Sequence, residues 1–187
     1  KAPVYTLRNI FDDAHKHNMK AGELKKLVPE ILNELNYTSG LLDNLLQWAK
    51  AQMLSNAVYR QEVEIENNIN EAVQLLSLQA KGKNIAIENV SPKGLYCFAD
   101  KDMINLVLRN LISNAIKFTP QNGNIAIGVL NYDSYLEIFV QDSGPGISSE
   151  ALEKINNNDF YSTKGTAFES GTGLGLILCK EFLSRSG

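Results

Sequence analysis

The segment Asp100-Lys-Asp-Met-Ile-Asn-Leu-Val-Leu-Arg-Asn-Leu-Ile-Ser-Asn-Ala-Ile-Lys-Phe-Thr-Pro120 has the pattern of one long amphipathic helix. Pairs of apolar residues recur at intervals of four, from Met103/Ile104 to Ala115/Ile116, so one face of the helix is fully apolar. Asp100 is of a residue type that is preferred at the helix N-cap. We therefore predict a helix over residues 101–118 with Asp100 as its cap.

The flanking sequence predicts short strands and a further helix. Alternating apolar residues or short apolar runs mark strands over residues 85–90, 95–99, 125–129 and 136–140, with residues 131–134 as a hairpin turn. An amphipathic helix is expected over residues 69–80, ended by Lys81-Gly82. These elements predict an α/β sandwich with helices on one face of a mixed sheet.

The long helix also carries a polar face opposite its apolar one. Asn110, Asn114 and Lys117 are spaced four and three residues apart and therefore lie on one side. Asn114 can offer a side-chain oxygen to Mg²⁺, which takes its remaining ligands from water and phosphates. Asn110 can hold a phosphate oxygen or a water ligand, and Lys117 can offset phosphate charge. Taken alone, such a face can equally be merely solvated.

A second polar motif, Gln141-Asp-Ser-Gly-Pro-Gly-Ile147, follows the strand predicted at residues 136–140. The carboxylate of Asp142 can accept a hydrogen bond from the exocyclic amino group of adenine, a group that guanine lacks at that position. Gly144 and Gly146 would let the backbone pass close to the base. The alternative is that this string forms only a tight turn.

A glycine-rich loop, Gly171-Thr-Gly-Leu-Gly-Leu176, precedes an apolar helix that runs through Phe182. Backbone N–H groups at such a helix N-terminus can bind phosphates, with the helix dipole assisting. The alternative is a flexible loop without a ligand. The polar stretch from Ser148 to Ser170 is the part of the chain with the least regular pattern.

Together these motifs resemble the sensor histidine kinases. Residues 110–120 resemble the N box of that family, residues 142–146 the G1 box and residues 171–176 the G2 box. Phe160 resembles the F box, and residues 148–170 resemble the mobile lid that closes over ATP. Ser-Thr-Lys-Gly-Thr166, ahead of the G2 box, resembles kinases of Bacteroidetes type, including hybrid sensors.

The resemblance implies an ATP-binding fold of the GHKL or Bergerat type, with ATP and Mg²⁺ as cofactors. It implies a catalytic role for Asn110, Asn114 and Lys117, with Asn114 as the metal ligand. The residues that it implies for nucleotide binding are Asn114, Lys117, Asp142, Gly144, Gly146, Ile147, Phe160, Gly171, Thr172, Gly173, Leu174, Gly175 and Leu176.

The N-terminal third of the chain is helical throughout in its pattern. From Glu23 to about Ser55, apolar residues alternate steps of four and three: Leu24, Val28, Ile31, Leu35, Thr38, Leu42, Leu45 and Ala49. A shorter amphipathic helix precedes this seam, with residues 18–22 as the turn, and Pro29 is expected to bend the longer helix slightly. Two helices joined by a short turn predict an antiparallel hairpin.

This hairpin is expected to dimerise, because one hairpin cannot bury both flanks of its apolar stripe. The prediction is a four-helix bundle in a homodimer; the alternative is a hairpin packed against its own second domain. The helix at residues 42–52 is similar to the dimerisation and phosphotransfer domain of the same kinase family. We therefore expect two domains, residues 1–56 and 57–187, and an α+β chain overall.

Both ends of the chain depart from the family pattern. Lys1-Ala2-Pro3 fits the last three positions of the phosphoacceptor motif H-[DE]-L-[RK]-x-P, which would place the acceptor histidine three residues before Lys1. His15 and His17 lie in a polar stretch beside the turn and do not match that motif. The chain also stops where the family adds one or two further strands.

The resemblance implies transfer of the γ-phosphoryl group of ATP to that histidine, and then to an aspartate of a response-regulator receiver domain. Other classes remain open: a gyrase-like or mismatch-repair ATPase, a serine kinase on the same fold, or a degenerate nucleotide-binding scaffold.

Composition excludes several other functions. The formal charge of −3 is spread along 187 residues, which does not favour a nucleic-acid binder or a polybasic membrane binder. No apolar run is long enough to span a bilayer, and the expected location is the cytoplasmic kinase portion of a membrane-anchored parent. Cys97 and Cys179 are predicted to be buried, reduced thiols.

Overall fold

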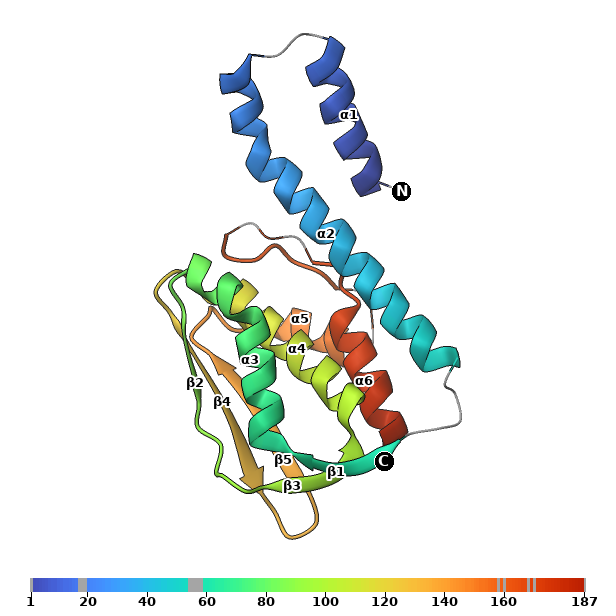
Figure 1. Cartoon of the computed structure of the whole chain (residues 1–187), viewed down its shortest axis with the longest axis vertical. Coiled ribbons are helices and arrows are strands. Elements are labelled where there is room, and N and C mark those ends of the chain that lie inside the picture. Colours follow the sequence, from blue (N-terminus) through green and yellow to red (C-terminus); the bar gives the residue numbers. More distant parts are fainter. Residues whose placement is uncertain are drawn as a thin grey trace.

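A computed structural model of the chain describes residues 2–16, 20–53, 59–157, 159, 161–167, 169 and 171–186. Its helices are α1 (Ala2–Lys16), α2 (Ala21–Met53), α3 (Ile65–Gly82), α4 (Lys101–Phe118), α5 (Ser149–Asn156) and α6 (Gly175–Ser186). Its strands are β1 (Arg60–Glu64), β2 (Ala86–Asn89), β3 (Tyr96–Asp100), β4 (Asn124–Asn131) and β5 (Leu136–Asp142) (Figure 1).

Helix α4 has the bounds that the sequence predicts. The side chain of Asp100 accepts hydrogen bonds from the backbone amides of Asp102 and Met103, at 3.0 and 3.2 Å, which satisfies two of the free amides of the first turn. Thr119 is extended because Pro120 follows it, and the helix therefore ends at Phe118. The predicted cap and helix are confirmed.

The strands form two sheets, whereas the sequence pattern predicts one. In the three-stranded sheet, β4 lies between β2, which is parallel to it, and β5, which is antiparallel. Strand β3 instead pairs antiparallel with β1, a strand that the pattern of apolar residues does not predict. The pattern missed β1 because Val63 is its only buried side chain, so it lacks alternation of apolar residues. The prediction of a single mixed sheet is therefore wrong for the strand at residues 96–100.

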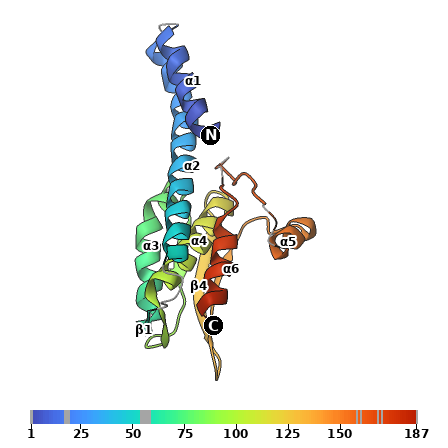
Figure 2. The same ribbon diagram turned by 90° about the vertical axis from the view of Figure 1, so that its right-hand side faces the viewer.

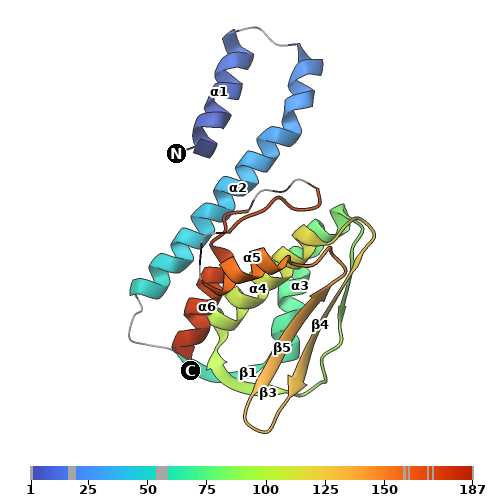
Figure 3. The ribbon, with the colours of Figure 1, turned by 180° about the vertical axis from the view of Figure 1, so that it is seen from behind.

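Helices α3 and α4 cover one face of the three-stranded sheet (Figures 1 and 3). The core between them includes Ile69, Ile112 and Ile127, none of which exposes any surface. Burial of each such side chain stabilises the fold by about 1.5–3 kcal/mol. A second, smaller apolar cluster joins α6 to α4 through Leu106, Leu178 and Phe182. This cluster fixes where the glycine-rich segment ahead of α6 can lie.

Helices α1 and α2 lie side by side at one end of the molecule, and the second half of α2 lies against α6 (Figure 1). Helix α2 starts at Ala21, inside the turn predicted at residues 18–22. Pro29 lies within the helix. Large apolar side chains on α2 stay exposed in the single chain: Val28, Leu32, Leu35, Leu42, Leu45 and Leu46. The Leu24 side chain of the predicted seam lies outside what the structure describes. None of the described helices has the length and apolar character that crossing a bilayer requires.

Helix α5 occupies part of the stretch from Ser148 to Ser170, which lacks a regular apolar pattern. The hydroxyl of Ser148 accepts a hydrogen bond from the backbone amide of Ala151, at 3.3 Å, and Ala151 is the one buried residue of the helix. Figure 2 shows α5 projecting away from the other helices. Periodicity missed it because its other side chains are mostly polar and exposed.

Both cysteines are free thiols; the predicted burial is confirmed for Cys179 and is wrong for Cys97. Burial raises the pKa of Cys179 to about 12, and burial likewise raises the pKa of Cys97, which is only partly buried.

Candidate functional site

The polar face of α4 forms the floor of a cavity. Asn110, Asn114 and Lys117 are half-buried and line it together, as their spacing predicts. The Asn110 amide donates a hydrogen bond to the carbonyl of Leu106 at 3.2 Å, which leaves its side-chain oxygen directed elsewhere. The sequence prediction that these three residues face one space is confirmed.

Asp142 lies at the end of β5 on another wall of the same cavity. One of its carboxylate oxygens accepts a hydrogen bond from the backbone amide of Gly144 at 2.8 Å. This turn packs directly against the end of α4, because a Cβ atom on Gly144 would lie only 2.6 Å from the Phe118 carbonyl oxygen. Gly146 has a positive φ of 76°, a conformation that glycine adopts without strain. The close approach at Gly144 thus brings the Asp142 carboxylate beside the end of α4.

The glycine-rich loop meets the polar face of α4 at two points. A Cβ atom on Gly175 would lie 2.6 Å from the side-chain oxygen of Asn110, and one on Gly171 would clash with the Lys117 ammonium group. Gly173 has a positive φ of 70°. The loop therefore lies along the face from Asn110 to Lys117, and a side chain at either glycine would displace the polar side chain that faces it.

The Lys117 ammonium group is held by the segment that precedes this loop. It donates a hydrogen bond to the backbone carbonyl of Thr163 at 2.6 Å. Burial lowers the pKa of Lys117, and the nearby carboxylate of Glu169 opposes that shift. A partly desolvated ammonium beside glycine-rich backbone suits an anionic ligand.

A second lysine, Lys83, contacts the same region and was not singled out from the sequence. Its ammonium group reaches the carbonyls of Ile116 and Lys117 and the side chains of Thr166 and Glu169. These partners lie 33 to 86 residues away along the chain, so no local sequence pattern predicts the contact.

Most of the predicted site residues line this one cavity. They are Asn110, Asn114, Lys117, Asp142, Gly146, Ile147, Gly171, Thr172, Gly173, Gly175 and Leu176. Leu174 instead packs against the small apolar cluster between α4 and α6, and Gly144 supports the turn without lining the cavity. Phe160 lies outside the described residues. Asn105, Arg109 and the α2 residues Asn33 and Tyr37 also line the cavity and were not predicted.

The ligand atoms around the cavity suit a magnesium ion whose other ligands are mainly phosphate oxygens and waters. The described residues include no cluster of three His, Cys, Asp or Glu side chains that could enclose a metal. Asn114 can contribute one hard oxygen ligand. One or two ligands from the protein are usual for Mg²⁺ when phosphates and waters supply the others.

Residues 99–187 match the family model described as "Histidine kinase-, DNA gyrase B-, and HSP90-like ATPase", and membership implies ATP binding. Histidine protein kinase DivJ of Caulobacter vibrioides is 33% identical over 162 residues, which cover 82% of this chain and 27% of DivJ. Sensor histidine kinase WalK of Bacillus subtilis is 29% identical over 194 residues, covering 100% of this chain and 31% of WalK. The chain thus spans between a quarter and a third of these relatives.

Solved structures show the same likeness in the fold. The catalytic domain of histidine kinase ThkA superposes with a TM-score of 0.60 at 32% identity, covering 68% of this chain and 81% of that domain. ThkA in complex with response regulator protein TrrA superposes with a TM-score of 0.71 at 28% identity, covering 88% of this chain and 48% of that one. Likeness in sequence and fold over most of a kinase catalytic domain shows that the chain belongs to the sensor histidine kinase family.

Proposed function

We propose that this chain is the kinase core of a sensor histidine kinase. It binds magnesium-ATP and transfers the γ-phosphoryl group to a histidine, which we expect three residues before Lys1 because Lys1-Ala2-Pro3 resembles the end of the phosphoacceptor motif. The observation that carries the proposal is that the α4 polar face, Asp142 and the glycine-rich loop line one cavity.

In this proposal the base and the phosphates bind at different walls. Asp142 accepts a hydrogen bond from the adenine amino group with the carboxylate oxygen that does not bond Gly144. The ammonium group of Lys117 and the backbone amides of the loop at residues 171–175 neutralise phosphate charge. Lys117 would exchange the Thr163 carbonyl for a phosphate oxygen, because a charged acceptor binds an ammonium more strongly.

Asn114 would hold Mg²⁺ through its side-chain oxygen, and the ion supplies positive charge to the phosphates when ATP is bound. Asn110, held against Gly175, would orient a phosphate oxygen or a ligand water. These groups act by positioning and electrostatics, which carry most of the catalysis in phosphoryl transfer.

We further propose that residues 1–56 form the dimerising and phosphotransfer part and residues 57–187 the catalytic part. The exposed apolar side chains of α2, among them Leu42 and Leu45, support a homodimer in which two helical pairs cover each other. The phosphoryl group would then pass to an aspartate of a response-regulator receiver domain. The solved complex of ThkA with its response regulator supports such a partner.

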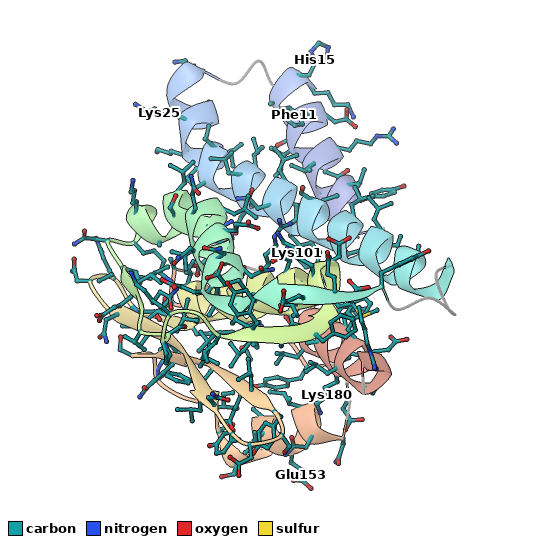
Figure 4. The ribbon with its side chains drawn as sticks, turned by 60° about the horizontal axis from the view of Figure 1, so that its bottom comes forward. Phe11, His15, Lys25, Lys101, Glu153 and Lys180 are labelled. Atoms are coloured by element: carbon teal, nitrogen blue, oxygen red, sulfur yellow. The ribbon has the colours of Figure 1, made fainter. Side chains whose placement is uncertain are left out.

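The histidines within the chain are not the proposed acceptors. His15 lies at the end of α1 that faces α2 across their connection, far from the catalytic part (Figure 4). It is about 17 residues beyond the expected acceptor, or roughly 25 Å along a helix at 1.5 Å per residue. His17 lies outside the described residues.

A phosphorylation assay tests the proposal. The chain extended upstream with the residues of its parent protein should form an acid-labile, base-stable phosphate from ATP, mapped to the added histidine. Replacing His15→Gln and His17→Gln should leave the yield unchanged. The chain from Lys1 should bind magnesium-ATP by calorimetry without becoming phosphorylated. A phosphohistidine at His15 or His17 would contradict the acceptor assignment, and absence of ATP binding would contradict the kinase assignment.

A further inference from the structure

Lys83 carries an ammonium group that is almost fully enclosed. Its side chain is 13% exposed, and its nitrogen lies 2.7 Å from the Ile116 carbonyl, 3.0 Å from the Lys117 carbonyl, 2.6 Å from the Thr166 hydroxyl and 3.1 Å from Glu169. A buried ammonium is costly unless it is paired and hydrogen-bonded, and this one is both.

These partners belong to two segments that lie apart in sequence. Ile116 and Lys117 end α4, where free carbonyls and the negative end of the helix dipole favour a cation. Thr166 and Glu169 belong to the segment just ahead of the glycine-rich loop. Lys83 therefore joins the end of the helix with the polar face to the segment that leads into the loop.

Further contacts hold that segment in one position. The Thr166 hydroxyl lies 2.8 Å from the Thr119 carbonyl oxygen. The backbone amide of Thr166 donates a hydrogen bond to the Lys117 carbonyl at 3.0 Å. The second carboxylate oxygen of Glu169 accepts from the backbone amide of Ala167 at 2.8 Å. A Cβ atom on Gly165 would lie 2.7 Å from the Lys117 carbonyl oxygen, so the segment packs against α4 without room for a side chain there.

This arrangement fixes what the Lys117 ammonium can reach. The same segment places the Thr163 carbonyl on that ammonium, and Gly171 packs against it from the loop. Lys83, Thr166 and Glu169 do not line the cavity themselves. Any influence of theirs on a nucleotide must therefore pass through Lys117 and the loop.

We infer that Lys83 and Glu169 form a partly buried clamp that positions Lys117 and the glycine-rich loop for the phosphates of ATP. The inference rests on the proposed nucleotide-binding function. Lys83 is a positioning residue here, since it does not touch the cavity. The side-chain hydrogen bonds of Lys83 and Glu169 join Ile116, Lys117, Thr166 and Ala167 and do not involve Asp142, although the Asp142 turn also packs against the end of α4. Breaking the clamp should therefore weaken binding of the phosphates while leaving binding of the base unchanged.

The test compares ATP with adenosine, which keeps the base and lacks the phosphates. Lys83→Met and Glu169→Gln should each weaken ATP binding by about tenfold in calorimetry, the effect of losing one charge-assisted contact. Adenosine binding, measured by NMR titration, should stay unchanged. Lys83→Arg should restore part of the ATP affinity, because a guanidinium can still donate to carbonyls and to Glu169.

Lys101→Met is the matched control. Lys101 forms an ion pair with Glu71 at 3.6 Å near the start of α4 (Figure 4), and its own side chain does not line the cavity, although its neighbours Asp100 and Asp102 do. The Lys101→Met substitution should leave the affinities for ATP and for adenosine unchanged.

Each outcome decides something. Unchanged ATP affinity in folded Lys83→Met and Glu169→Gln would overturn the clamp while leaving the kinase proposal intact. Equal loss of ATP and adenosine would show a general role in the fold and would also overturn it. Absence of ATP binding by the unaltered chain would contradict both the proposed function and the clamp. Circular dichroism identifies a variant that fails to fold, in which case Glu169→Gln, which keeps the side-chain shape, decides.

Discussion

The side-chain oxygen of Asn110 lies 2.6 Å from the position that a Cβ atom would occupy on Gly175. This approach joins the polar face of α4 to the first residue of α6, 65 positions further along the chain, and it leaves no room for a methyl group. Gly175→Ala should therefore displace Asn110 and lower phosphorylation of the upstream-extended chain by at least about tenfold, equivalent to 1.36 kcal/mol in the barrier.

Gly82→Ala is the control for this substitution. Gly82 also belongs to a helix, but nothing lies within 4 Å of the position of its Cβ atom. The phosphorylation rate of the Gly82→Ala variant should match that of the unaltered chain. Full activity of Gly175→Ala would show that the approach of Asn110 to the loop has no part in catalysis.

Asp142→Asn should weaken ATP binding by roughly ten- to a hundredfold, because it removes a charge-assisted hydrogen bond worth about 1.5–3 kcal/mol. An asparagine oxygen can still accept the hydrogen bond from the Gly144 amide, so the turn should persist. GTP should bind poorly to both forms. Asp133→Asn, in the turn between β4 and β5, serves as the control, and an unchanged calorimetric ATP affinity in Asp142→Asn would contradict the assignment of the base site.

Lys117 should give ATP binding an alkaline limit. Burial lowers the pKa of its ammonium group below the usual 10.5, so the charge is lost as pH rises through that lowered pKa. ATP affinity should then fall, by up to tenfold per pH unit, at a pH where exposed lysines are still charged. Lys117→Arg should remove this limit, since a guanidinium remains charged. An affinity that is flat across this range in the unaltered chain would argue against a phosphate contact by Lys117.

A charge placed on the exposed apolar stripe of α2 should prevent dimerisation. Leu42 and Leu45 are each 54% exposed in the single chain, and Leu42→Glu or Leu45→Glu would bury an unpaired carboxylate in a four-helix bundle. Light scattering on the upstream-extended chain should give a dimer that these substitutions dissociate. Leu78→Glu, at an 80% exposed position on α3, should leave the dimer intact. A monomer for the unaltered extended chain at high concentration would refute the bundle.

The sequence predicted those features that depend on neighbouring residues. The bounds of α4 follow from an apolar repeat and a capping aspartate, and the common orientation of Asn110, Asn114 and Lys117 follows from helical geometry. The position of Asp142 at a strand end follows from the alternation that precedes it.

The features that the sequence did not predict depend on contacts between distant segments. Strand β1 is stabilised by pairing with β3 rather than by its own pattern, and α5 has a local cap but only one buried residue. The contact of Lys83 with Glu169 spans 86 positions and arises only when α3, α4 and the loop pack together. Such contacts are set by the tertiary arrangement and have no local signal.

The small cluster of Leu106, Leu178 and Phe182 has a consequence for the order in which the molecule is completed during synthesis. Every residue of the larger core, from Val63 to Val129, emerges from the ribosome before Leu178 does. That core can begin to consolidate while the glycine-rich segment is still being made. The cavity gains its last wall only when α6 docks on α4, so a nascent chain can be well advanced in folding before it has any place for a ligand.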